Sequence, residues 1–87
     1  MPGTAVSVTV RYFAGARAAA GTEQEVLSLP DGATVADVCA EVSARHGQGL
    51  TRVLAAASFL VDEVVSGPDR ALADGASVDV LPPFAGG

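Results

Sequence analysis

The feature that most restricts the fold of this sequence is a strict alternation of apolar and polar residues near its start. The apolar positions are Val6, Val8, Val10 and Tyr12, and the polar positions between them are Ser7, Thr9 and Arg11. Successive side chains of a β-strand point to opposite faces of the sheet. This period of two therefore predicts a strand over residues 5–12 with one buried face.

Further stretches predict the remaining strands. Residues 23–29 end in the turn signal Pro30-Asp31-Gly32 and are expected to form a hairpin-like pair with the first strand. Residues 58–61 and 62–65 predict two short strands about a tight turn, and a final strand is expected over residues 77–81.

The main helix is predicted over residues 35–46. Thr34 is a suitable N-cap, and Asp37 falls near the positive end of the helix dipole. Val35, Val38, Cys39, Val42 and His46 recur at helical spacing, and Gly47 ends the pattern. Shorter helical segments are predicted over residues 14–20, closed by Gly21, and over residues 50–55.

Together these elements predict an α+β domain in which a mixed sheet of four to five strands packs on one main helix. A chain of 87 residues with 49% hydrophobic content can build one core but not two. We expect one domain over residues 1–81 and a projecting tail over residues 82–87. Pro82-Pro83 must end the last strand, because proline cannot donate a ladder hydrogen bond.

Composition excludes several classes of function. The formal net charge of -5 disfavours nucleic acid and favours protein partners with basic faces. One cysteine and one histidine make neither a disulfide nor a zinc-type ligand set, so no metal is expected. With no secretory signal and no apolar run long enough to cross a bilayer, we expect a cytoplasmic protein without a membrane partner.

Ordinary catalytic motifs are missing from the sequence, which argues against an autonomous enzyme. Cys39 is interpreted as a small core residue and His46 as a cap or dipole partner at the helix end. The acidic residues Asp62, Glu63, Asp74 and Asp79 are interpreted as solvated turn residues. Phe59 and Leu60 are expected in the core, with contact to a partner as the alternative.

The C-terminal residues Gly86-Gly87 carry the most specific chemistry. Two glycines can thread a channel that excludes side chains, and Gly87 presents an unhindered carboxylate. A carboxylate must be activated, for example as an acyl adenylate, before it can act as an acyl donor. Because the chain has no nucleotide-binding motif, a partner enzyme is expected to use ATP for this step. Pro82-Pro83 would stiffen the exit from the sheet and hold Phe84 and the glycines away from the body.

The ending Leu81-Pro82-Pro83-Phe84-Ala85-Gly86-Gly87 resembles that of the MoaD/ThiS family of ubiquitin-like sulfur carriers, in particular the small subunits of molybdopterin synthases. Residues 8–14 and 72–78 also match this family. The resemblance implies a β-grasp fold and two partners, an E1-like adenylyltransferase/sulfurtransferase and the large subunit of molybdopterin synthase. It implies no permanently bound cofactor.

On this resemblance, Gly87 is adenylated and then converted to a thiocarboxylate, which donates sulfur to build the dithiolene of molybdopterin. Gly86 allows threading, and Pro82, Pro83, Phe84 and Ala85 seat the tail in the partner. The chain departs from the family at Asp62-Glu63, where Asn-Gly is frequent, and at Phe84, where a small aliphatic residue is usual.

Two alternatives stay open. A carrier of the same fold could serve another pathway, such as thiamin thiazole, cysteine or a secondary metabolite. A protein modifier joined to lysines of target proteins is the other alternative. All five basic residues of this chain are arginines, so such a modifier could not form lysine-linked chains of itself.

Overall fold

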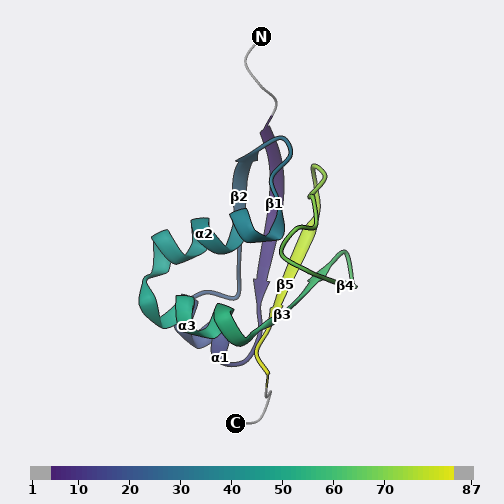
Figure 1. Cartoon of the computed structure of the whole chain (residues 1–87). Helices are drawn as coiled ribbons and strands as arrows, with labels where there is room; N and C mark the ends of the chain where they lie inside the picture. The colour runs from purple at the N-terminus through teal and green to yellow at the C-terminus, as the bar shows by residue number, and fades with distance from the viewer. Residues whose placement is uncertain (1–4, 84–87) are drawn as a thin grey trace.

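The computed structural model describes residues 5–83 and contains one five-stranded sheet with three helices. The elements in chain order are β1 (Ala5–Tyr12), α1 (Gly15–Ala20), β2 (Gln24–Pro30), α2 (Val35–His46), α3 (Gln48–Ala56), β3 (Ser58–Val61), β4 (Val64–Ser66) and β5 (Ser77–Leu81) (Figure 1). This arrangement confirms the predicted α+β, β-grasp class.

The sheet has the strand order β2-β1-β5-β3-β4. β1 pairs antiparallel with β2, as predicted, and parallel with β5, while β3 pairs antiparallel with both β5 and β4. The register places Val10 beside Val78 and Tyr12 beside Val80, so the apolar side chains of the central strands share one face. The sheet is therefore mixed, with β5 at its centre and β1 and β5 as its parallel pair.

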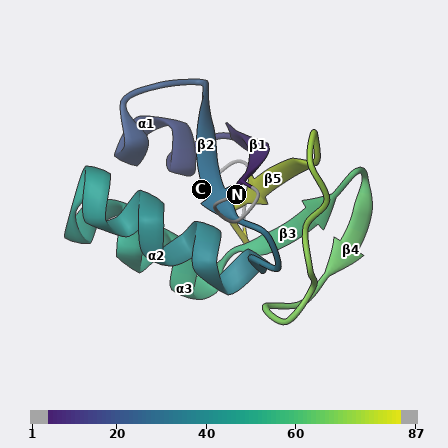
Figure 2. The same cartoon turned by 90° about the horizontal axis from the view of Figure 1, so that it is seen from above.

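All three helices cover this apolar face and leave the opposite face of the sheet open (Figures 1 and 2). The core comprises the inward residues of the strands together with residues of every helix, among them Ala16, Val38, Val42, Leu50 and Leu54. The prediction of one covering helix was too simple, because α3 spans Gln48–Ala56 rather than a short turn over 50–55 and contributes two leucines to the core. β4 lies at the sheet edge farthest from the helices (Figure 2).

The bounds of α2 agree with the prediction because both ends are set locally. The Thr34 side chain accepts from the Asp37 N–H, and the Asp37 carboxylate accepts from the Thr34 N–H at 2.8 Å, which completes a capping box. At the other end Gly47 has φ 89°, a conformation that L side chains rarely adopt. Gly47 thereby turns the chain between two consecutive helices.

The turn between β3 and β4 has two non-glycine residues with positive φ, Asp62 at 48° and Glu63 at 72°. A two-residue hairpin turn of this hand favours Asn-Gly, and other residues adopt it at a cost. Asp62 offsets part of that cost, because its Oδ1 accepts from the Ser77 N–H at 3.0 Å and its own N–H donates to the Ser77 carbonyl at 2.9 Å. Both acidic residues are exposed, as predicted.

Candidate functional site

The base of the predicted tail lies at the end of β5, in the middle of the sheet. β5 is flanked by β1 and β3 and ends at Leu81. Pro82 is half-buried and Pro83 is exposed, so the chain passes from the sheet to the surface within these two residues. Phe84, Ala85, Gly86 and Gly87 lie outside the described residues, and their predicted roles stay predictions.

Both neighbouring strands fix the exit point of the chain. On one side the Phe13 N–H donates to the Val80 carbonyl at 3.3 Å, and on the other side Leu81 is paired with Ser58. A strand held from both sides has little freedom at its end. The residues that follow Leu81 therefore start from a rigid base.

A salt bridge lies on the open face just before this exit. Arg11 and Asp79 are cross-strand partners, and the guanidinium donates from Nε at 2.7 Å and from Nη2 at 2.8 Å to the two carboxylate oxygens. The hydrogen bond to Asp79, followed by its charge, raises the pKa of Arg11. The Arg11 guanidinium also lies 5.7 Å from the centroid of the Phe13 ring, within the range of a cation–π contact.

The prediction that Asp79 is a solvated turn residue was wrong. Asp79 is only 5% exposed and lies in the middle of a central strand, between Val78 and Val80. Its carboxylate is directed to the open face because its two neighbours point to the core, and Arg11 covers it there. Strand alternation predicts the direction of the Asp79 side chain but not its partner. Arg11 is 68 residues away along the chain and becomes a neighbour only because β1 pairs with β5.

A second polar cluster lies on the helix-covered face, centred on Glu25 of β2. Glu25 Oε2 accepts a short hydrogen bond from the Tyr12 hydroxyl and lies 2.6 Å from His46 Nε2. Glu25 Oε1 accepts from Arg45 Nη1 at 3.3 Å. This cluster ties the C-terminal end of α2 to strands β1 and β2.

The environment shifts the pKa of two members of this cluster. Burial raises the pKa of the Tyr12 hydroxyl, and the hydrogen bond to Glu25 raises it further. Burial alone would raise the pKa of Glu25, but the hydrogen bonds from Tyr12 and His46 and the nearby positive charges outweigh it and lower the pKa. The prediction of His46 as a cap or dipole partner at the helix end did not include its side-chain partner Glu25, which is 21 residues away in sequence.

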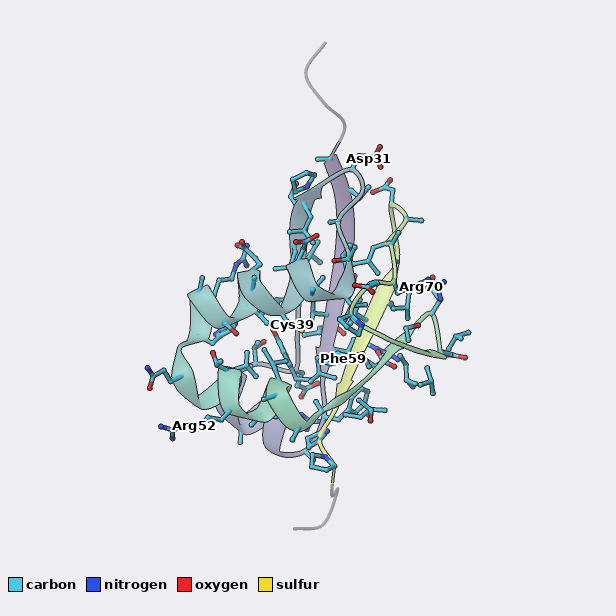
Figure 3. The ribbon with its side chains drawn as sticks, viewed as in Figure 1. Asp31, Cys39, Arg52, Phe59 and Arg70 are labelled. Carbon is cyan, nitrogen blue, oxygen red and sulfur yellow. The ribbon has the colours of Figure 1, made fainter. Side chains whose placement is uncertain are left out.

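The remaining candidates are structural. Cys39 is half-buried on α2, packs against the core, and its thiol pKa is raised by burial (Figure 3). A protonated thiol is a weak nucleophile, which agrees with the prediction of a small packing residue. Phe59 packs against the core, whereas Leu60 lies half-buried on the open face. The core prediction therefore holds for Phe59 and fails for Leu60.

Residues 5–83 contain no group of three or more His, Cys, Asp or Glu side chains placed to hold a metal ion. Of the helices within the same range, none has the length and apolar character needed to cross a membrane. The positive finding is that the chain leaves the central strand β5 beside the salt bridge between Arg11 and Asp79.

Comparison with known proteins identifies relatives of this arrangement. The chain is 33% identical over 84 residues to the molybdopterin synthase sulfur carrier subunit of Chlamydomonas reinhardtii, and the match covers 94% of this chain and all of the relative. It superposes on the structure of molybdopterin converting factor subunit 1 from Pyrococcus furiosus with a TM-score of 0.82 and 33% identity, over 91% of this chain and 99% of the other.

Two other solved structures share the fold. The small archaeal modifier protein 1 of Methanosarcina acetivorans is 25% identical with a TM-score of 0.80, over 98% of this chain and all of the other. In a complex of subunits 1 and 2 of molybdopterin-converting factor from Helicobacter pylori, one chain is 20% identical with a TM-score of 0.66, over 94% of this chain and 100% of that one. This last likeness concerns the fold alone.

The model of the ThiS family matches residues 10–87, from the end of β1 through β5 to the tail motif. The match extends over most of the chain, and the structural relatives agree with it in fold. The chain therefore belongs to the ThiS family, the MoaD/ThiS group of ubiquitin-like sulfur carriers that its sequence resembles.

Proposed function

We propose that this protein carries sulfur as a thiocarboxylate on Gly87 and donates it in molybdopterin synthesis, as the small subunit of a molybdopterin synthase. A partner enzyme of the E1-like adenylyltransferase/sulfurtransferase class uses ATP to convert the Gly87 carboxylate to an acyl adenylate. A sulfur nucleophile then displaces AMP and leaves the thiocarboxylate. We place this activity in the cytoplasm.

The observation that carries the proposal is the family match, which runs through the tail to Gly87 on a chain whose described residues form the carrier fold. The curated relative of 33% identity is a molybdopterin synthase sulfur carrier subunit, which favours this pathway over thiazole or cysteine formation. The position of Pro82 and Pro83 at the end of a central strand supports a tail that starts from a fixed point.

The large subunit of molybdopterin synthase is the second proposed partner. The Helicobacter pylori structure is a complex of subunits 1 and 2 of molybdopterin-converting factor. It supports the same kind of assembly for this chain. In such an assembly Pro82 to Gly86 would occupy a channel of the partner, and the absence of a side chain at Gly86 would let the chain pass its narrowest part. The partner would supply the groups that act on the pterin precursor.

The test is intact mass spectrometry of the full chain after incubation with the cognate activating enzyme, ATP and a sulfur donor. Replacement of one carboxylate oxygen by sulfur adds about 16 Da, and this gain is the expected result. A sample without ATP serves as the control. No gain with an activating enzyme that loads another carrier would contradict the proposal.

A second candidate function is supported by the likeness to the small archaeal modifier protein 1 of Methanosarcina acetivorans. A modifier would join Gly87 to lysine side chains of other proteins through isopeptide bonds. Immunoblots of cell extract under reducing and denaturing conditions distinguish the two functions. Adducts that persist under these conditions support the modifier, and their absence in cells that hold the thiocarboxylate form supports the carrier.

A further inference from the structure

The outer edge of β2 presents backbone groups that have no partner strand within residues 5–83. The Tyr12 N–H donates to the Glu23 carbonyl, whereas the Thr9 N–H donates to the Ala76 carbonyl on the β5 side. The β1 residues that bond to β2 are therefore the even-numbered ones, and antiparallel pairing alternates in the same way along β2. It follows that the N–H and C=O groups of Val26 and Ser28 point away from β1.

This edge is long and weakly protected. β2 spans seven residues and is the terminal strand in the order of the sheet, so no strand within residues 5–83 lies on its outer side. Edge strands are commonly shielded by charged side chains, bulges or proline. Here the open-face positions are Gln24, Val26 and Ser28, and Val26 is 60% exposed. Only Pro30, at the end of the strand, removes a donor.

A groove of about 420 Å³ runs between the end of β2 and the first half of α2. Its apolar floor includes Leu29, Ala33 and Ala40, and its rim carries Asp31, Asp37 and Glu41. Asp31 lies in the turn after β2, at the opposite end of the molecule from Arg52 (Figure 3). The groove therefore combines an apolar floor with an acidic rim.

Within residues 5–83, no basic side chain lines this groove, and the nearest cation along α2 is Arg45. Arg45 donates to Glu41 at 3.1 Å and to Glu25 at 3.3 Å, one turn beyond the groove. The rim thus carries three carboxylates: Asp37 also accepts the capping hydrogen bond from Thr34, and Glu41 accepts from Arg45 beyond the groove. A positively charged occupant would complement this rim, and an acidic one would be repelled.

We propose that the outer edge of β2 and the adjoining groove bind an extended basic segment of a partner protein as an additional strand. Its backbone would pair with the outward groups of Val26 and Ser28, as in other cases of strand addition. Alternate side chains would enter the groove, where the methylene stems of arginine or lysine cover the apolar floor and their charged ends meet the rim. The remaining side chains would lie beside Val26 on the open face.

The test uses the full chain and a capped heptapeptide that alternates valine with arginine. Two-dimensional ¹⁵N–¹H NMR should show the largest shift changes at the amides of Val26 and Ser28 and around Asp31. The same peptide with N-methylated valines lacks the donors for strand pairing, and a valine–glutamate peptide carries the opposite charge. Neither of these peptides should bind measurably at concentrations that saturate the first.

A pair of double variants separates the groove from general charge attraction. Asp31→Asn with Glu41→Gln removes two rim charges and should weaken binding roughly three- to tenfold. Asp62→Asn with Glu63→Gln removes the same charge from the far side of the sheet and should leave the affinity unchanged. Thermal melting verifies that both proteins are folded.

Three results would overturn the proposal. The first is a lack of shift changes with the valine–arginine peptide, and the second is shifts that fall on Leu60 and Ser77 of the open face instead. The third is an equal loss of affinity in both double variants, because attraction to net charge would then explain the binding.

Discussion

The two faces of the sheet use the same kinds of charged groups in different ways. On the helix-covered face, Glu25 is held by Tyr12, His46 and Arg45 beneath the end of α2. On the open face, the Asp79 carboxylate meets a single guanidinium whose side chain is 41% exposed. The covered face thus joins three elements of the fold, whereas the open face joins two neighbouring strands. Stability should therefore depend on the covered face, and the open face and the sheet edges are available to partners.

The largest difference between the faces should appear in neighbouring residues of β2. Leu27 is fully buried, and Leu27→Ala should lower the free energy of unfolding by about 3 kcal/mol through lost burial and the cavity left behind. Val26 is 60% exposed, and Val26→Ala should change the same quantity by about 0.5 kcal/mol or less. Urea unfolding followed by circular dichroism measures both. Similar losses for the two variants would mean that the faces do not differ as described.

The cluster on the covered face should also make stability depend on pH. The folded-state pKa of Glu25 lies below its unfolded value, so its contribution is complete above about pH 4.3 and is lost as pH falls through the folded pKa. Glu25→Gln should cost about 1–2 kcal/mol at pH 7, since the charge-assisted hydrogen bonds are weakened. The variant should also lose less stability than the wild type between pH 5 and pH 3.

Urea titrations at several pH values check this prediction. If the free energy of unfolding fell equally with pH in the two proteins, Glu25 would not couple protonation to folding. Thermal melts at pH 7 provide an independent measure of the cost of the substitution.

The smallest effect is expected at the turn that leads into the edge strand β4. Glu63 has φ 72°, so Glu63→Gly should relieve backbone strain and stabilise the protein by about 1 kcal/mol. The matched control is Glu41→Gly in α2, where glycine is expected to destabilise by about 1 kcal/mol. Thermal unfolding of both variants tests the pair. Destabilisation by Glu63→Gly would indicate that the positive φ carries no strain.

Sequence patterns predicted the elements whose determinants are local. The alternation over 5–12 and the caps at Thr34 and Gly47 gave β1 and α2 with the observed bounds. α3 was underestimated, because Gln48-Gly49 resembles a loop in the sequence, whereas these residues form the start of a second helix whose N-cap is Gly47.

The polar clusters could not be predicted, because they depend on which strands become neighbours. Asp79 was assigned to solvent and His46 to the helix end, whereas their partners Arg11 and Glu25 are distant in sequence. Period and capping identify the face of a side chain but not the residue across from it. The role of Gly87 followed from the chemistry of a glycine carboxylate and from family resemblance, and it remains a prediction.

The most direct test of the central claim compares the full chain with a variant that lacks Gly87. Both proteins are incubated with the activating enzyme, ATP and a sulfur donor, and fragmentation mass spectrometry then locates any added sulfur. The full chain should gain sulfur on Gly87 alone, while the deletion variant should gain none and should melt at the same temperature. Sulfur on the deletion variant, or on Cys39 of the full chain, would contradict the proposed carrier function.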